Sequence, residues 1–353
     1  MFPEHARIEN RFERISYSVS DEAVAVETQG GNLNAEKVRI ALEHALALWG
    51  VAAPVAFRPA GPDEEPLIRI RFTREGASAL NLGNTSGHVD RTPAGPYGAA
   101  SIRINCDNDL FVDRFFESDL HQTQPGPYDL VAILAHEVGH ALGIEHPPTD
   151  PATGSESEGG IMSDSVGNAV LRQLLPYDVR EVQARHGTIR VAETVGADLA
   201  ATGRLIDPAG EVSLQVAGRE LVLSGAMGSS ALLDVLVPAR GRVVNAIRLA
   251  FTLVTRNVLV NRVTVFDGIV PVQELAVSAR AADNDGIAGK RFDLRLGLLR
   301  RPRAASDMLV RLQVFFTRAG GQPESDFGVL QLHDVAVETL PLPIEVAREF
   351  EPS

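Results

Sequence analysis

The stretch that most constrains the fold reads His-Glu-Val-Gly-His-Ala-Leu-Gly-Ile-Glu-His and begins at His136. Residues four apart share one face of a helix, so His136 and His140 would direct their rings to one point, with Glu137 beside them. Glycine accepts the positive φ that ends a helix, so Gly143 would turn the chain back and bring His146 to the same point. The stretch therefore predicts a helix, a sharp turn and a metal site with three histidine ligands.

Three neutral imidazoles would leave the fourth tetrahedral position of a zinc ion to water, which is typical of a catalytic rather than a structural zinc site. The stretch fits HExxHxxGxxH at every fixed position. This longer pattern is more specific than HExxH alone. The alternative is a buried amphipathic helix that carries hydrogen-bonded histidines by chance, and we rank it lower because the whole pattern matches.

The pattern resembles that of the metzincin metallopeptidases, whose second mark is a methionine turn beneath the metal. A Gly-Ile-Met-Ser segment follows His146 at a similar spacing, so Met162 is the candidate for that turn. In astacins and serralysins a tyrosine two residues after the methionine also approaches the metal, but Asp164 occupies that position here. The chain therefore resembles the matrixins most closely, with Pro147 after the third histidine as a serralysin-like feature.

The resemblance implies a zinc-dependent metalloendopeptidase. A zinc ion on the three histidines would lower the pKa of a water molecule, and Glu137 would be the general base that accepts its proton. The activated water would attack a peptide carbonyl, and Glu137 would return the proton to the departing amine. The implied partner is a polypeptide substrate that pairs with an unpaired strand edge within residues 79–90.

Two other classes of function stay open. In the first, the chain is a non-catalytic binding or adhesion protein with a structural or vestigial zinc site, although such a site has no need of Glu137 beside its first ligand. In the second, the main role belongs to the C-terminal part, as a carbohydrate or protein adhesion module. No cluster of exposed aromatic residues can be placed in that part to support the second reading.

The fold class that we expect is an α+β metzincin-type peptidase domain followed by an all-β, sandwich-like domain. A chain of 353 residues exceeds the usual size of a single hydrophobic core, so two domains are the default. The expected boundaries are a peptidase domain over 1–187, a linker over 188–205, a β-sandwich accessory domain over 206–345 and a tail over 346–353.

For the first domain we expect a mixed twisted sheet and three main helices. Periodicity predicts strands at 14–19, 68–72 and 80–89 and from Ile102, and helices at 33–50, after Pro127 and at 175–187. In the first of these helices we expect Asn34 as the N-cap, Gly50 as the stop, Trp49 in the core and His44 on the surface.

From about residue 206 apolar and polar residues alternate, as at 212–216, 292–296 and 310–314. Such runs, separated by Gly, Pro, Asp and Asn, predict an antiparallel β-sandwich. The segment from Asp283 to Gly286 is expected to form a hairpin turn.

Additional metal sites are less well supported. Matrixins commonly carry a second, structural zinc, and His88 to Asp90 resemble the first half of such a site. No suitably placed histidine follows before Asn105, so we expect that site to be absent and His88 to lie in a solvated loop. Asp107 and Asp109 offer the oxygen ligands that Ca²⁺ prefers, but a polar turn explains them more simply.

Composition limits partners and location. A net charge of −13 argues against binding of nucleic acid and favours a solvated monomer. The single cysteine, Cys106, excludes an internal disulfide framework, and we expect a small buried thiol rather than a cysteine switch. No segment has the length and apolar character of a membrane span. The resemblance implies an extracellular location, although the N-terminus shows no secretory signal.

Overall fold

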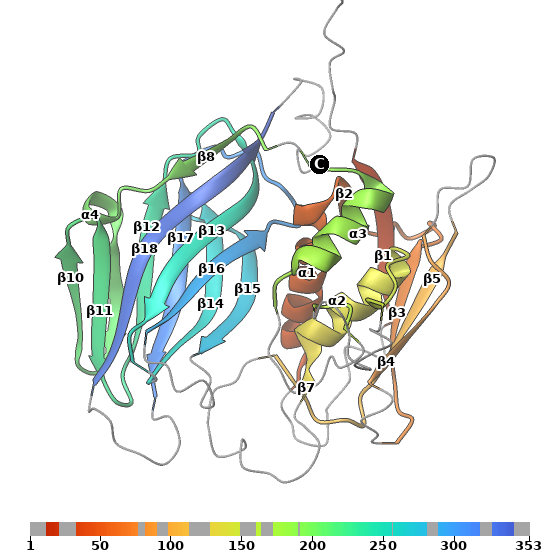
Figure 1. Ribbon diagram of the computed structural model, residues 1–353, viewed down its shortest axis with the longest axis horizontal. Coiled ribbons are helices and arrows are strands. Elements are labelled where there is room, and N and C mark those ends of the chain that lie inside the picture. The colour runs from red at the N-terminus through yellow and green to blue at the C-terminus, as the bar shows by residue number, and fades with distance from the viewer. Residues whose placement is uncertain are drawn as a thin grey trace, which may run out of the picture.

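The computed structural model describes residues 12–20, 33–76, 82–89, 98–112, 128–148, 160–163, 172–189, 191–255, 257–280, 289–317 and 327–341. These residues form two hydrophobic cores. One core contains residues up to Val182 together with Ala276, and the other contains residues from Leu199 onward. Figure 1 shows the helix-containing N-terminal region at the right and the β-rich C-terminal region at the left. The described chain is therefore mostly β.

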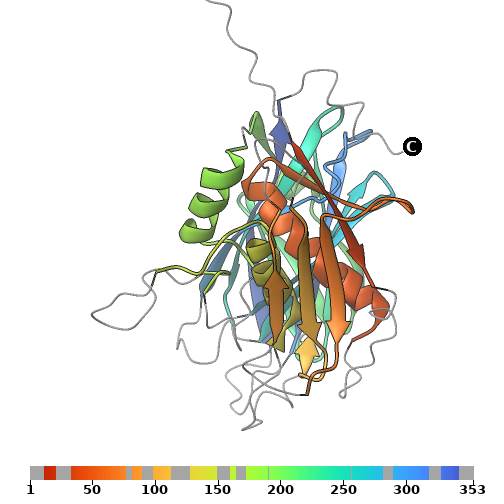
Figure 2. The ribbon, with the colours of Figure 1, turned by 90° about the vertical axis from the view of Figure 1, so that its right-hand side faces the viewer.

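The N-terminal region contains a mixed five-stranded sheet in the order β2-β1-β3-β5-β4, seen in front in Figure 2. Strands β1, β2, β3 and β5 run parallel, and β4 is antiparallel to β5 at the edge. The strand β2 was not among the sequence predictions. The strands are β1 (Glu13–Val19), β2 (Val55–Pro59), β3 (Ile68–Thr73), β4 (Gly83–Ser86) and β5 (Ala100–Asn105), with a separate pair formed by β6 (Leu110–Phe111) and β7 (Tyr128–Asp129).

Helix α1 (Ala35–Ala52) begins where the sequence predicts, because the Asn34 side chain accepts a hydrogen bond from the Lys37 amide at 2.9 Å. The helix continues two residues beyond Gly50, the predicted stop. Trp49 lies in the core, and its indole N–H donates to the carbonyl of Ala135 at 2.8 Å. This bond ties α1 to helix α2, which carries the first two histidines.

The prediction that His44 lies on the surface is wrong. Helix α1 contacts α2 on one side and strands β15 (Val270–Arg280) and β16 (Lys290–Gly297) on the other. The C-terminal region thus covers the face that a lone peptidase domain would leave to solvent. His44 is fully buried, and burial, with a smaller effect from the nearby Arg172, lowers its pKa to about 3.

Two further helices complete the N-terminal region, α2 (Leu130–Ala141) and α3 (Pro176–His186). Helix α2 begins at Asp129, whose carboxylate accepts a hydrogen bond from the Val131 amide at 3.0 Å. Almost all of α2 is buried, so its position is set by packing on several sides. Among the described helices, none combines the length and the apolar character needed to cross a membrane.

The C-terminal region consists of two antiparallel sheets that share one core. One has the order β10-β11-β18-β13-β16, with β8 also paired to β18, and the other has the order β15-β14-β17-β12-β9. The remaining elements are β8 (Glu193–Gly196), α4 (Leu199–Thr202), β9 (Arg204–Ala209), β10 (Val212–Ala217), β11 (Glu220–Ala226), β12 (Ser230–Val237), β13 (Val243–Leu253), β14 (Val258–Asp267), β17 (Met308–Phe316) and β18 (Phe327–Leu340).

The segment that we expected to be a linker, 188–205, contains elements of its own. Strand β8 pairs with β18 and helix α4 packs against β11 and β12, so these residues are part of the C-terminal region. The predicted hairpin turn at 283–286 and the predicted tail at 346–353 lie outside the described residues.

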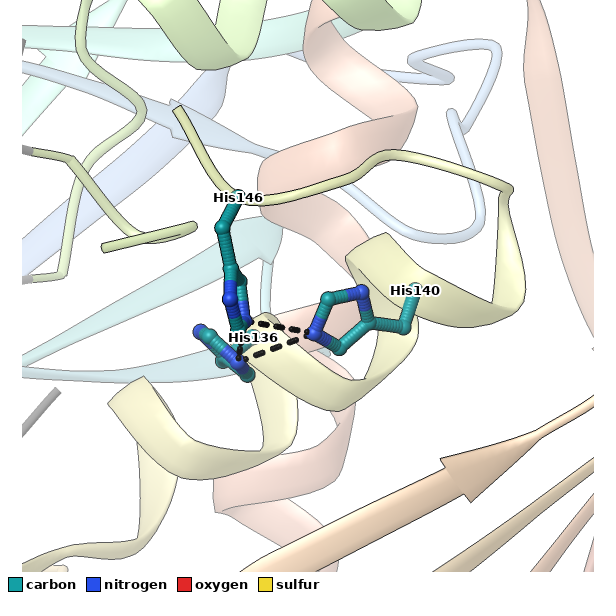
Figure 3. A group of neighbouring side chains, drawn as sticks. All are labelled: His136, His140 and His146. Atoms are coloured by element: carbon teal, nitrogen blue, oxygen red, sulfur yellow. Dashed lines mark hydrogen bonds between the residues drawn. The ribbon is translucent and has the colours of Figure 1, made fainter. Parts of the chain in front are cut away.

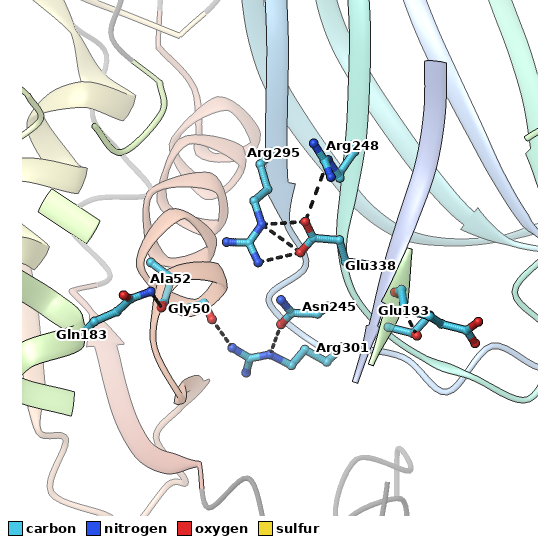
Figure 4. A network of polar contacts seen from close by, with 10 residues as sticks. Gly50, Ala52, Gln183, Glu193, Asn245, Arg248, Arg295, Arg301 and Glu338 are labelled. Carbon is cyan, nitrogen blue, oxygen red and sulfur yellow. Dashed lines mark hydrogen bonds and ion pairs between the residues drawn. The ribbon is translucent and has the colours of Figure 1, made fainter. Parts of the chain in front are cut away.

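The two regions are in close contact along α1. Gly297 of β16 approaches α1 so closely that a Cβ on it would lie 2.2 Å from the carbonyl oxygen of Ala47. Nearby, the buried guanidinium of Arg301 donates to the carbonyl of Val55 at 2.8 Å. It also donates to the carbonyl of Gly50 and to the side chain of Asn245 at 2.9 Å (Figure 4). The C-terminal region therefore bonds directly to the end of α1.

Candidate metal centre

The rings of His136, His140 and His146 converge on one point, as Figure 3 shows. Their Nε2 atoms lie 3.1 Å (His136 to His140), 3.0 Å (His140 to His146) and 3.2 Å (His136 to His146) apart. Zn–N bonds of about 2.0–2.1 Å at tetrahedral angles would place such nitrogens roughly 3.3–3.4 Å apart. Among the residues that the structure describes, this is the only group of three or more potential metal ligands within reach of one ion.

Backbone carbonyls fix the orientation of two of the rings. The Nδ1 atom of His136 lies 2.8 Å from the carbonyl oxygen of Ile161, and Nδ1 of His140 lies 2.8 Å from that of Ile144. A carbonyl oxygen only accepts, so each Nδ1 carries the hydrogen and each neutral ring presents a lone pair at Nε2. Lone pairs directed at one point repel each other unless a cation lies between them. The donor set thus fits a zinc ion with an open fourth position.

The turn that brings His146 back forms as the sequence predicts. Gly143 has a φ of 79°, in the left-handed region that glycine tolerates. The amides of Gly143 and Ile144 bond to carbonyls in the last turn of α2, which is the Schellman arrangement of a helix end. Beyond the turn, the Tyr177 hydroxyl lies 3.1 Å from the carbonyl oxygen of His146 and holds the returning segment.

Met162 lies in the turn where the sequence places it, fully buried under α2. A Cβ on Gly139 would lie 2.2 Å from the Met162 sulfur and 2.6 Å from Cζ2 of Trp49. The helix can therefore rest on the methionine only because residue 139, between the two helical histidines, has no side chain. Sequence reasoning found the methionine but missed this requirement.

Asp178 anchors the methionine turn, and sequence reasoning missed this role. Its fully buried carboxylate accepts hydrogen bonds from the amides of Ile161 at 3.0 Å and Met162 at 3.1 Å, in addition to the amide of Leu175 at 2.8 Å. Burial raises the pKa of Asp178, although these hydrogen bonds oppose the rise. Because Ile161 also accepts from His136, this carboxylate indirectly orients the first ligand.

Glu137 follows the first ligand and is 5% exposed. Burial raises its pKa to about 7, although a hydrogen bond from the Thr85 hydroxyl acts in the opposite direction. The hydroxyl oxygen of Thr85 lies 2.6 Å from Oε2 of Glu137. Thr85 belongs to the edge strand β4, and the sequence alone could not fix which residue of 79–90 would face the helix.

None of the other predicted residues that the structure describes belongs to this cluster. His88 is exposed, and both Asp90 and Asp164 lie outside the described residues. Asp107 accepts a hydrogen bond from the Gly76 amide at 2.7 Å, which links the segments that follow β3 and β5. Cys106 is buried, and burial raises the pKa of its thiol to about 11.

Comparison with known proteins agrees with this geometry. Residues 13–184 match the family model for matrixins. This part of the chain is similar to the matrixin metallopeptidases. The match covers the mixed sheet, helices α1 and α2, most of α3 and all of the proposed ligands.

One relative is matrix metalloproteinase-C of Caenorhabditis elegans, 28% identical over 203 residues. The alignment covers 52% of this chain and 30% of the relative, so the chain spans less than a third of that protein. The alignment with the structure of myroilysin covers 49% of this chain and 79% of the myroilysin chain, with 14% sequence identity and a TM-score of 0.27. The alignment with TmCBM27, a carbohydrate-binding module that recognises mannan, covers 43% of this chain and 98% of that module, with 11% identity and a TM-score of 0.28. TM-scores this low do not assign a fold to this chain.

Proposed function

We propose that the chain is a zinc-dependent metalloendopeptidase. The observation that supports this most directly is that the Nε2 atoms of the three histidines lie close enough together to bind one zinc ion. The buried carboxylate of Glu137 lies next to them. The matrixin-like character of residues 13–184 supports the same class of reaction. A non-catalytic protein with a vestigial site is less well supported, because such a site has no need of a buried carboxylate at Glu137 next to its first ligand.

Each residue of the centre has a distinct task in this proposal. His136, His140 and His146 hold the ion, and zinc supplies a Lewis acid that lowers the pKa of water. Glu137 accepts the proton of the attacking water and then donates it to the amine nitrogen as the peptide bond breaks. Met162 lies beneath the helix as its support and takes no part in the proton transfer.

The polypeptide substrate is expected to bind along the edge strand β4. This strand pairs with β5 on one side only among the described residues. Its other edge presents backbone N–H and C=O groups that an extended peptide can pair with. For the C-terminal region we propose a β-sandwich accessory domain that positions the peptidase on a substrate or surface. Calcium remains a secondary candidate, without a ligand group of its own among the described residues.

The decisive experiment compares the wild-type protein with Glu137→Ala against a peptide library, with and without a chelator. We expect the wild type to cleave peptides only with zinc present. We expect Glu137→Ala to bind one zinc ion per chain but to lose about 10²- to 10⁴-fold in kcat/KM, the usual range for loss of a general base. Glu181→Ala, which changes a partly exposed glutamate on α3, is the matched control. Full cleavage by Glu137→Ala would overturn the assignment of the base.

A further inference from the structure

Strand β4 lies directly against the carboxylate of Glu137. Side chains alternate along a strand, so Gly83 and Thr85 face the same side, and both lie close to that carboxylate. Asn84 and Ser86 lie on the opposite side and are exposed. The edge strand thus presents one residue without a side chain and one hydroxyl to the proposed general base.

Gly83 provides the space for the carboxylate. A Cβ at this position would lie 2.7 Å from Oε1 of Glu137 and 2.9 Å from its Cγ, which is closer than real side chains approach. The backbone of β4 is held by pairing with β5, where Gly83 is opposite Ile104. A side chain at residue 83 would therefore displace the carboxylate rather than the strand.

Thr85 provides the hydrogen bond that fixes the carboxylate. Its hydroxyl oxygen lies 2.6 Å from Oε2 and 3.0 Å from the backbone carbonyl oxygen of Glu137. A hydroxyl has one hydrogen, and the shorter contact with the charged oxygen is the stronger bond. The terminal torsion of a glutamate is otherwise soft, whereas a β-branched threonine is stiff. The bond therefore removes the main rotational freedom of the Glu137 carboxylate.

We propose that Thr85 is a positioning residue for Glu137 and that Gly83 gives the carboxylate room to be held. The proposal rests on the proposed function, in which Glu137 is the general base. With Oε2 accepting from Thr85, Oε1 is the oxygen that receives the proton from water and passes it to the amine. The strand expected to pair with the substrate thus also orients the base.

The kinetic test compares Thr85→Val, which removes the hydroxyl at almost constant shape, with Thr85→Ser, which keeps it. We expect Thr85→Val to lower kcat about 10- to 100-fold, since a small misplacement of a catalytic group has effects of this size. KM should stay within about twofold, because substrate binding is not the step affected. Thr85→Ser should recover most of the activity, and Ser18→Ala, in β1 of the same sheet and away from the substrate edge, should behave as the wild type. Zinc content should be the same in all four proteins.

A second readout does not depend on catalysis. In the zinc-free protein, Thr85→Val should lower the melting temperature. In a Glu137→Ala background the same substitution should lower it by clearly less, because the partner of the hydroxyl is gone. Gly83→Ala should also lower the melting temperature, and Glu137→Ala should relieve part of that loss by removing the carboxylate that the new methyl group meets.

The outcomes separate this inference from the proposed function. If the wild type cleaves peptides and Thr85→Val matches it in kcat, the positioning role is refuted. If the melting shift of Thr85→Val is the same with and without Glu137, the hydrogen bond is refuted. The wild type could also cleave no peptide in the library while the melting shift of Thr85→Val still depends on Glu137. That result would refute the proposed function and establish the Thr85–Glu137 hydrogen bond.

Discussion

The metal centre and the contact between the two regions both direct polar groups at backbone carbonyls, but they differ in charge. At the centre, carbonyls of Ile161 and Ile144 accept from imidazoles, whose lone pairs then face one point. At the contact, carbonyls of Gly50 and Val55 accept from the guanidinium of Arg301. The first arrangement needs an added cation, whereas the second is completed by a cation from the chain itself.

This difference separates the contact between the two regions, which folding alone completes, from the three imidazoles, which a bound cation would complete. The buried Arg172 and Arg301 bond to oxygen atoms of the protein itself. The imidazoles are partly exposed and are held in place by the turn at Gly143 and by the methionine turn. The fold therefore holds the three imidazoles of the proposed zinc site in place, and the C-terminal region supports them through its contacts with α1, which packs against α2.

The largest effect is expected at Arg172, which joins the start of α2 to the C-terminal region. Its guanidinium binds both oxygens of the buried Asp129, at 2.8 and 2.9 Å, and the carbonyls of Ala276 and Val112 at 2.6 Å. Arg172→Leu would leave a buried carboxylate without its cation, which costs about 3–5 kcal/mol. Urea unfolding measures this loss. Arg39→Leu, which changes an exposed arginine, is the control. If Arg172→Leu lost no more stability than this control, the buried ion pair would not stabilise the protein as we expect.

Arg301→Met should have a smaller effect, although Arg301 is equally buried. Burial lowers the pKa of Arg301 to about 9, and its hydrogen bonds end on uncharged oxygens among the described residues. Removing it leaves unpaired carbonyls but no uncompensated buried charge, so we expect a loss of about 2–3 kcal/mol in unfolding free energy. The measurement is the same urea titration, run beside Arg172→Leu. A greater loss than for Arg172→Leu would reverse the ranking.

Gly139→Ala tests the packing beneath the metal centre. The added methyl group would meet the Met162 sulfur and the Trp49 ring, and overpacking of this kind costs about 1–3 kcal/mol. Because residue 139 lies between His136 and His140, zinc affinity should fall together with stability. Zinc titration and urea unfolding of the same samples check both effects. Unchanged zinc affinity with lowered stability would show that the methionine turn does not set the ligand geometry.

His186 should give the smallest effect, and one that depends on pH. Burial lowers its pKa, but hydrogen bonds with Glu13 at 2.8 Å and with the Leu142 carbonyl at 3.1 Å outweigh this, so the pKa is raised above 6.5. The stabilisation is full below the unfolded pKa, near 6.5, and is lost as the pH rises through the folded pKa.

Replacing His186 by Gln should therefore cost about 1 kcal/mol at pH 6 and less at pH 9. Urea unfolding across this range measures the difference from the wild type, with the exposed His88→Gln as the control. A cost that grows with pH would contradict the raised pKa.

Much of the metal centre was predictable because its signals are local. The spacing of His136, His140 and His146 and the glycine before the last of them define the ligand set within a single helix and turn. Met162 followed from its position after the third histidine. Local capping likewise predicted the start of α1 at Asn34, because a cap depends only on residues three positions apart.

The sequence alone predicted a metal site with three histidine ligands and the alternation typical of a β-rich C-terminal region. Only the tertiary structure decided that Thr85 and Asp178 support the centre, that Arg301 reaches α1 where Gly50 has no side chain, and that His44 is buried. These contacts join residues far apart in sequence, and periodicity reports only which face of an element is apolar, not what covers it. Helix α1 is covered on both sides, and no pattern within α1 itself could reveal its second neighbour.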